Sequence, residues 1–353
     1  MKKPVVLFIL KRREDFDPVK HNPVGLSTGL YNSATFMKDM LVEGGVDARL
    51  EVAIDNNCID RLVTKHRPTH VIIEALWVVP SKFVILSKLH PTVKWIIRLH
   101  SELPFLAGEG MALNWIGDYS AFPNIILGVN APRMMDEVRT YLQIKNQCST
   151  EMINKKVIYL PNYYPQEYKS KQYMINKEYV DIGCFGAVRP LKNHMLQAVA
   201  AIKFADSLGK KLNFHINGGR IEMKGEPVIN NLRDMFLHLY ERGHRLITHE
   251  WTPREQFLEV CASMDIGLQV SFSETFNIVG ADMISQGVPL VASIEIPWIC
   301  EIYTARAQYS DEIYKALILT NSWPKENVLA NQQKLTEYTN QTRGIWLKYF
   351  TEE

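Results

Sequence analysis

The sequence lacks any long apolar run. No stretch among its 353 residues approaches the ~20 apolar residues that a helix needs to span a bilayer, so we expect any membrane association to be peripheral. The apolar stretch from Pro4 to Leu10 is short and is followed at once by the basic cluster Lys11 to Arg13, which argues against a signal peptide.

The sequence also lacks a large excess of positive or negative charge, and its cysteines show no paired spacing. Forty Lys and Arg against 38 Asp and Glu leave a net charge of +2, so the chain has no gross signature of polyanion binding. Lys11 to Arg13 and Lys169 to Lys171 remain local candidates for contact with an anionic acceptor. The five cysteines form no C-x-x-C pair and are odd in number, which favours a reducing compartment, and we expect a cytoplasmic protein.

The most informative segment that is present runs from Ser271 to Ser293. Its pattern predicts a βαβ unit, with two acids, Glu274 and Asp282, eight positions apart at the opening of the helix. The predicted strand, loop, helix, cap and second strand are Asp265 to Val270, Ser271 to Asn277, Ile278 to Gln286, Gly287, and Val288 to Ser293.

The spacing of the two acids suits an elongated ligand. On a helix, eight residues advance ~12 Å and return the side chain to nearly the same face. Two carboxylates so placed can hold polyols at opposite ends of a ligand whose middle is a diphosphate, because helix N-termini bind anions. That ligand would be a nucleotide-sugar. Two solvated acids favoured by the helix dipole explain the same spacing, so both interpretations stay open at this point.

The segment resembles the E-x7-E signature of retaining glycosyltransferases with the GT-B fold, of the family 4 type. The positions that match are Glu274, Phe276, Met283, Gly287, Pro289, Val291, Ala292 and Ser293, and those that depart are Thr275, Asn277, Asp282 and Ser285. The resemblance implies that Glu274 contacts hydroxyls of the donor sugar and that Asp282 accepts from the ribose. It also implies that backbone amides of Thr275, Phe276, Asn277 and Ile278 touch the sugar and phosphate.

A basic loop upstream supports the same interpretation. A strand from Tyr179 to Gly186 and a helix from His194 to about Ser207 place Arg189 and Lys192 at a strand-to-helix turn, where cations can neutralise a diphosphate. The loop resembles the G-R-L-x-P-x-K-N loop of the family, with Lys192 at the lysine position. Ala187 occupies the arginine position, so a phosphate role for Arg189, two residues later, is a substitution hypothesis. A solvated basic loop is the alternative.

Between these segments the order of elements fits a nucleotide-binding Rossmann half. In the family the loop after the third strand lies against the base, which makes Trp251 or its neighbours the predicted nucleobase contact; a buried core tryptophan is the alternative. The expected strand with a glycine turn, helix, strand and helix are Lys211 to Gly219, Asn230 to Arg242, Ile247 to Pro253 and Arg254 to Met264.

The first half of the chain predicts a second doubly wound unit. Its loop from Asn22 to Gly29 resembles the family's N-terminal loop, which implies that Thr28 and Gly29 approach the acceptor and the donor diphosphate. His100 ends a predicted strand, where α/β folds place ligands, and the resemblance implies contact with the donor sugar; a structural histidine is the alternative. Glu102 is a candidate for the acceptor side. The expected strands and helix are Pro4 to Leu10, Thr69 to Ala75, Val93 to His100, Asn124 to Asn130, Val157 to Asn162, and Leu30 to Gly44.

The predicted fold is therefore α/β, of the GT-B type, with two Rossmann-like doubly wound domains facing across a cleft and a C-terminal helix that crosses back to the N-terminal domain. We expect an acceptor-side domain over residues 1–162, a linker over 163–177, a nucleotide-sugar domain over 178–330 and the returning helix over 331–353. Two domains also suit the length of 353 residues.

The predicted activity is transfer of a sugar from a UDP- or GDP-sugar to an acceptor hydroxyl with retention, without a cofactor or metal. Asp15 and Asp17 match the D-x-D string of metal-dependent transferases, but they follow the first strand too closely for its usual context. The acceptor is a glycan or lipid-linked sugar or, since the chain is similar to phage enzymes that glycosylate hydroxymethylcytosine, a modified base in phage DNA. A nucleotide-sugar 2-epimerase and a non-catalytic nucleotide-sugar or glycan-binding protein are the alternatives.

Overall fold

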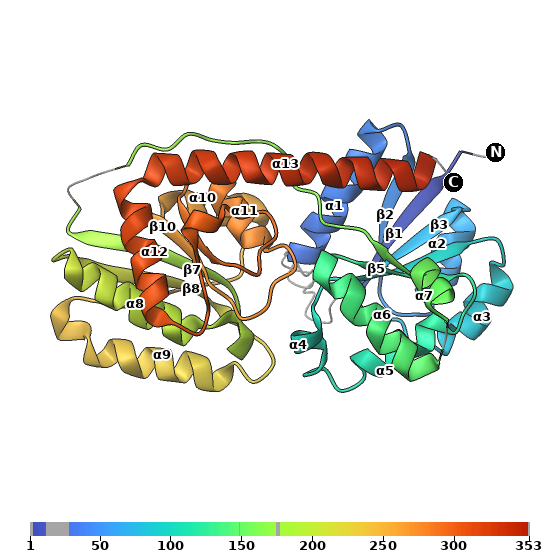
Figure 1. Cartoon of the computed structure of the whole chain (residues 1–353), viewed down its shortest axis with the longest axis horizontal. Coiled ribbons are helices and arrows are strands. Elements are labelled where there is room, and N and C mark those ends of the chain that lie inside the picture. Colours follow the sequence, from blue (N-terminus) through green and yellow to red (C-terminus); the bar gives the residue numbers. More distant parts are fainter. Residues whose placement is uncertain (1–2, 12–27, 148, 174–176, 352–353) are drawn as a thin grey trace, which may run out of the picture. The chain divides into compact units, whose positions relative to one another are not determined.

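The computed structural model describes residues 3–11, 28–147, 149–173 and 177–351, and the chain forms two compact units (Figure 1). The first unit comprises Met1–Pro165 and Thr339–Glu353, and the second comprises Gln166–Tyr338. Each unit contains a six-stranded parallel sheet with helices on both faces.

In the first unit the strands follow the order β2-β1-β3-β4-β5-β6. The strands are β1 (Val5–Lys11), β2 (Asp47–Ala53), β3 (His70–Glu74), β4 (Lys94–Leu99), β5 (Ile125–Val129) and β6 (Val157–Tyr159). The helices are α1 (Thr28–Glu43), α2 (Cys58–His66), α3 (Lys82–Leu89), α4 (Leu103–Leu106), α5 (Ala112–Ser120), α6 (Pro132–Asn146) and α7 (Thr150–Lys156).

Side chains of β1 alternate between two cores. Leu7 and Ile9 pack with residues of α2, α3, α5 and α6 on one face of the sheet. Phe8 packs on the other face with α1 and with Trp346, and the Phe8 and Trp346 ring centres are 6.1 Å apart. A strand covered on both faces is apolar throughout, which is why this sequence reads as a continuous apolar run and not as an alternating one.

In the second unit the order is β12-β11-β10-β7-β8-β9. The strands are β7 (Tyr179–Val188), β8 (Lys211–Ile221), β9 (Arg245–His249), β10 (Ile266–Gln269), β11 (Leu290–Ser293) and β12 (Thr304–Ala305). The α-helices are α8 (His194–Ser207), α9 (Glu226–His238), α10 (Arg254–Ser263), α11 (Ile278–Ser285), α12 (Ser310–Ser322) and α13 (Pro324–Thr351), and the 3-10 turns are η1 (Pro190–Lys192), η2 (Tyr240–Arg242) and η3 (Glu301–Tyr303).

The strand order of the second unit reverses between β7 and β10. Successive strands run outward from β7 on one side, through β8 to β9, and from β10 on the other side, through β11 to β12. In open parallel sheets the ligand site lies outside the carboxyl ends of the strands at such a reversal. The loops that leave β7 and β10 are the two loops singled out in the sequence.

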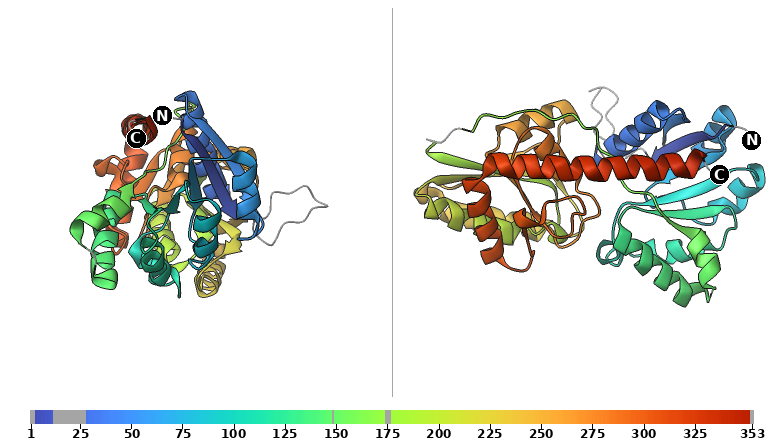
Figure 2. Two further views of the ribbon diagram at one scale, coloured as in Figure 1. Left: turned by 90° about the vertical axis from the view of Figure 1, so that its right-hand side faces the viewer. Right: turned by 45° about the horizontal axis from the view of Figure 1, so that its top comes forward.

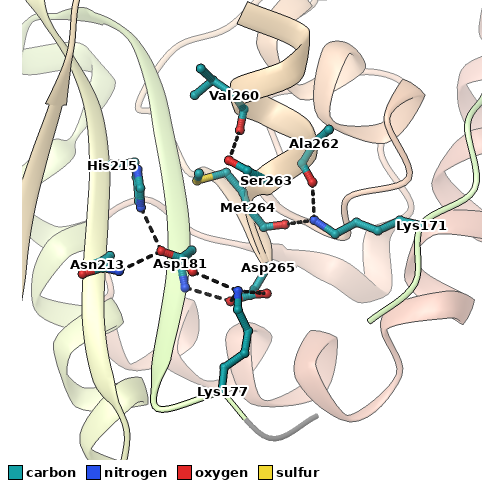
Figure 3. Close-up of polar contacts among 10 residues, drawn as sticks. All are labelled: Lys171, Lys177, Asp181, Asn213, His215, Val260, Ala262, Ser263, Met264 and Asp265. Carbon is teal, nitrogen blue, oxygen red and sulfur yellow. Dashed lines mark hydrogen bonds and ion pairs between the residues drawn. The ribbon is translucent and has the colours of Figure 1, made fainter. Parts of the chain in front are cut away.

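A network of charged and polar side chains joins the opposite, amino-terminal ends of β7 and β10 (Figure 3). The Lys177 ammonium donates to both Asp181 and Asp265, each at 2.9 Å. Asp181 also accepts from Asn213 at 2.8 Å and contacts His215 at 3.1 Å. Although burial acts in the opposite direction, these bonds hold the pKa of Asp181 well below its ordinary value. The network fastens the strands at the edge away from the expected site.

The C-terminal helix α13 begins in the second unit and ends in the first. Its 28 residues form one continuous helix (Figure 2). In the first unit Trp346 donates its indole N–H to the Pro161 carbonyl at 2.9 Å. The predicted return of the tail to the N-terminal unit is thus confirmed. Of the helices in the described parts of the chain, none is both long and apolar enough to cross a bilayer.

Candidate functional site

The loops that follow β7 and β10 bring Lys192 and Glu274 into an ion pair. Both side chains are largely buried, with exposed fractions of 12% and 8%. The two loops are also joined by their backbones, since the amide of Phe272 donates to the carbonyl of Leu191 at 2.9 Å. Lys192 and Glu274 are 82 positions apart in the sequence, so the fold assembles the basic loop and the acidic loop into one site at the strand-order reversal.

The Lys192 loop is held by two unusual backbone conformations. Gly186 has φ +115°, and a Cβ there would lie 3.6 Å from Cε of Lys192, so the lysine side chain runs directly over the glycine. Asn193 has φ 59°, and its side-chain amide donates to the carbonyls of Val270 and Ala307 at 3.1 and 2.8 Å. These contacts fix the position of Lys192 relative to the exit of β10.

Asn277 also corrects an expectation about the acids. It has φ 60°, its side-chain oxygen accepts from the amide of Gly280 at 2.7 Å, and its side-chain nitrogen donates to Gln269 at 3.0 Å. This cap starts the helix at Ile278, the first residue of α11, where the sequence predicted it. The interpretation of Glu274 and Asp282 as two residues on one helix face is therefore wrong: Glu274 lies in the preceding loop, and only Asp282 lies on α11.

Within this loop the Phe276 side chain belongs to the core. Its ring lies 6.0 Å from Trp298 and 5.7 Å from Tyr338, and its carbonyl accepts from the Trp298 indole at 2.6 Å. Thr275 beside it is also buried. The aromatic cluster anchors the loop, so the donor contacts predicted for Thr275 and Phe276 are restricted to their backbone atoms.

Asp282, the second acid of the signature, is paired with Arg254. The guanidinium donates to the carboxylate at 2.5 Å, and only 5% of the Asp282 side chain is exposed. Arg254 was not recognised in the sequence, although one signal was present. A cation as the first residue of a helix is disfavoured by the helix dipole, which indicates that it has a specific partner.

A second charged group surrounds Arg189. Its guanidinium contacts Glu222 at 3.4 Å, and Glu222 also accepts from Nε of Arg220 at 2.6 Å. The Arg220 guanidinium lies 4.9 Å from the ring centre of Trp251. Trp251 is only partly buried, in the loop after β9, so it is not the core tryptophan of the alternative interpretation.

His194 is a buried histidine directly after the basic loop. It has an exposed fraction of 1%, and neither of its ring nitrogens has a hydrogen-bond partner within the part of the chain that the structure describes. Burial, and to a lesser degree the charges of Lys192 and Arg189, lower its pKa to about 3. The imidazole is therefore neutral at pH 7.

Replacing His194 by leucine is expected to make stability less sensitive to acid. Below pH ~6.5, the ordinary pKa of histidine, His194 binds a proton in the unfolded chain but stays neutral in the folded protein. The free energy of unfolding therefore falls as the pH drops below ~6.5. For this group the loss from pH 7 to pH 5 is about 2 kcal/mol. We expect urea denaturation at the two pH values to show a loss smaller by that amount in His194→Leu. An equal loss in wild type and variant would contradict this assignment.

In the first unit His100 follows β4 and pairs with the Glu74 carboxylate. Glu74 also accepts from Arg98 at 3.1 Å, and the side chains of Glu74 and Arg98 have no exposed surface. Burial lowers the pKa of His100 despite the opposing charge of Glu74. The pKa of Glu74 is lowered as well, because Arg98 and His100 outweigh the effect of its burial. Glu74 was not singled out in the sequence, although an acid at the end of the apolar strand HVIIE was a signal.

The other predicted residues of the first unit are placed as follows. Glu102 is 2% exposed and accepts from Nε and Nη2 of Arg133, at 3.0 and 2.6 Å, so its carboxylate is engaged by a cation. Thr28 and Gly29 are the first residues of α1. The loop before them, residues 22–27, lies outside the described residues, as do Asp15, Asp17 and the arginines of the N-terminal basic cluster.

The chain is similar in structure to proteins whose sequences are only distantly alike. No family model matches the sequence, and no curated protein matches it. Sucrose-phosphate synthase from Thermosynechococcus elongatus superposes with a TM-score of 0.66 at 11% identity, over 99% of this chain and 100% of that one. HepE from Anabaena in complex with UDP superposes with a TM-score of 0.61 at 10% identity, over 99% and 97%.

A third similar structure is the N-terminal domain of trehalose-6-phosphate phosphatase from Candida albicans. It superposes with a TM-score of 0.68 at 9% identity, over 98% of this chain and 97% of that one. Together with the two sheets, these similarities confirm the predicted GT-B fold. At such identities a shared fold does not carry a shared activity, which has to be argued from the site.

Proposed function

We propose that this protein is a glycosyltransferase that moves a sugar from a nucleotide-sugar to an acceptor hydroxyl with retention of anomeric configuration. The observation that carries the proposal is the buried pair of Lys192 and Glu274 at the strand-order reversal of a Rossmann-like unit. Two further facts support it: the E-x7-E resemblance and the similarity in fold to sucrose-phosphate synthase and to HepE bound to UDP.

The donor is assigned to the loops of the second unit. Lys192 and Arg189 meet the diphosphate, together with backbone N–H groups near Ile278 at the start of α11. Glu274 accepts hydrogen bonds from sugar hydroxyls, and Trp251 packs against the base. The ribose hydroxyls contact the ion pair that Asp282 forms with Arg254. His100 keeps its assignment to the donor sugar on the family resemblance.

In the reaction the bond between the anomeric carbon and the phosphate oxygen breaks, and a bond from that carbon to the acceptor oxygen forms on the same face. The acceptor proton passes to the departing phosphate. The positive charge of Lys192 and Arg189 stabilises the diphosphate as its charge develops, so the proposal assigns no metal and no cofactor to this step. Glu274 keeps Lys192 oriented in a site with little water, where such electrostatic stabilisation is strongest.

A thermal-shift screen tests the donor assignment. We expect one of the UDP-, GDP-, ADP- or dTDP-sugars to raise the melting temperature selectively, to the same extent with and without EDTA. A ligand at a hundredfold excess over its Kd stabilises the native state by ~2.7 kcal/mol. Released nucleotide would then be measured with the ligand that binds. If none of these nucleotide-sugars shifted the melting temperature, the proposed function would be wrong.

The acceptor class is tested with the donor so identified. The two proposed classes are a glycan or lipid-linked sugar and a hydroxymethylated base in DNA. Each would be incubated with enzyme and donor, and the product examined by mass spectrometry for the added sugar. Unmodified DNA is the matched control for the DNA acceptor, because it lacks only the hydroxyl that would receive the sugar.

A non-catalytic nucleotide-sugar-binding protein is the second candidate. The Asp282–Arg254 pair favours it, because a carboxylate already bonded to a cation has less capacity left for ribose hydroxyls. This candidate predicts a thermal shift without released nucleotide in the presence of any acceptor. The epimerase alternative predicts conversion of the donor without an acceptor, which chromatography of the recovered nucleotide-sugar would detect.

A further inference from the structure

The sheet of the second unit contains an irregularity beside the position where the family's arginine is missing. Ala187 of β7 pairs with Asn217 of β8, but the next residue, Val188, pairs with Ile221. Residues 218–220 therefore have no partners in β7 and bulge from the strand. The glycines at 218 and 219, whose pattern predicts a turn that ends the strand, are part of this bulge. Bulges of this kind redirect a side chain at the end of a strand.

The last residue of the bulge is Arg220. The chain directly after it is fastened to the end of β7, because the amide of Glu222 donates to the carbonyl of Val188 at 2.9 Å. Gly225 packs on the same carbonyl so closely that a Cβ would lie 2.1 Å from the oxygen. The bulge thus holds Arg220 beside the β7 exit, although it comes from the neighbouring strand.

Arg220 and Arg189 share one carboxylate. Arg220 donates Nε to one oxygen of Glu222 at 2.6 Å, and Arg189 contacts the other oxygen at 3.4 Å. The exposed fractions of the three side chains, 18% for Arg220, 20% for Glu222 and 21% for Arg189, leave part of each accessible. The Glu222 carboxylate offsets the repulsion between the two guanidinium groups, and because planar guanidinium groups bind phosphate oxygens in pairs, a diphosphate can compete with it for them.

We infer that Arg220 binds the diphosphate of the donor in place of the arginine that is absent at Ala187, and that Glu222 positions Arg220 and Arg189 for this contact. The inference rests on the proposed function. The ring of Trp251 supports the orientation, since the Arg220 guanidinium lies over it, 4.9 Å from the ring centre, while Nε and Nη2 contact Glu222. The Glu222 carboxylate and the diphosphate of the donor would compete for the same two guanidinium groups.

The inference is tested by calorimetric titration with UDP and with uridine, which lacks the diphosphate. If the thermal-shift screen selects another base, its diphosphate and nucleoside replace them. For Arg220→Gln we expect the Kd for UDP to rise by at least tenfold, while the Kd for uridine stays unchanged. Arg242→Gln is the matched control: this arginine of the same unit also pairs with a carboxylate, that of Asp206 at 2.5 Å, but it lies in η2. It should leave both constants unchanged.

Glu222→Gln separates a ligand-binding role from a structural one. If Arg220 and Arg189 bind the diphosphate, removal of the competing carboxylate charge lowers the Kd for UDP several-fold. The decrease in Kd is smaller at high salt. A purely structural ion pair predicts equal or weaker binding. If Arg220→Gln is too unstable to titrate, Arg220→Lys keeps the charge without the bidentate geometry and should still weaken UDP binding.

The outcomes distinguish a failure of the proposed function from a failure of the role of Arg220. If the wild-type protein binds none of UDP, GDP, ADP and dTDP, the proposed function fails. If it binds one of them with the same Kd in the wild type, in Arg220→Gln or Arg220→Lys, and in Glu222→Gln, the role of Arg220 is overturned while the proposed function stands.

Discussion

Replacing Lys192 by alanine is expected to lower the rate of glycosyl transfer by about 10²–10³-fold or more, which is the usual effect of removing one group that stabilises developing charge. Glu274→Ala should have an effect of similar size, because the two side chains form one buried ion pair and the loss of either displaces the other. The measurement is the initial rate of nucleotide release with donor and acceptor both saturating. The loss should appear in kcat and not only in KM.

Lys203→Ala is the matched control for this experiment. Lys203 also pairs with a carboxylate in the second unit, that of Asp311 at 2.8 Å, but both side chains are 55% exposed. Its removal should leave the rate within about twofold of the wild type, since exposed ion pairs contribute little. Near-normal rates in both Lys192→Ala and Glu274→Ala would refute the assignment of the active site.

The sequence was sufficient to predict the βαβ unit around Glu274 and the basic loop around Lys192. In both, glycine and proline punctuate short apolar strands, and this local pattern fixes where the strands end. Because parallel strands end at one edge of a sheet, two loops 82 positions apart could be expected at one site. The ion pair of Lys192 and Glu274 agrees with that expectation.

What escaped prediction depends on contacts between distant residues. The left-handed backbone of Asn277, whose side chain bonds to Gln269 in β10, separates Glu274 from the helix that carries Asp282. Arg220 lies in a bulge that exists only because β7 and β8 pair out of register there. Neither feature follows from the periodicity of the local sequence, since each is set by a neighbouring strand.

The buried pair of Glu74 and Arg98 leads to the largest expected effect on stability. Glu74→Ala should destabilise the first unit by about 3–5 kcal/mol, the usual cost of leaving one charge of a buried pair uncompensated. Arg98 has no exposed surface and cannot turn to solvent without disrupting its bonds to the carbonyls of Leu160 and Pro161. Hydrogen exchange of the β3 and β4 amides measures the free energy of opening within this unit. Glu151→Ala, which removes an exposed partner of Lys155 in the same unit, is the control and should change little.

The double variant Glu74→Leu with Arg98→Met tests whether the loss of stability in Glu74→Ala comes from leaving the buried charge of Arg98 unpaired. Removing both charges relieves the burial of an unpaired ion, so stability should return to within about 1–2 kcal/mol of the wild type. His100 would then lose the carboxylate that fixes its ring, and the effect of Glu74 in raising its pKa would vanish. If His100 acts on the donor sugar, the double variant stays folded and loses activity. A double variant that is folded and fully active would show that the network serves stability alone and would remove His100 from the proposed site.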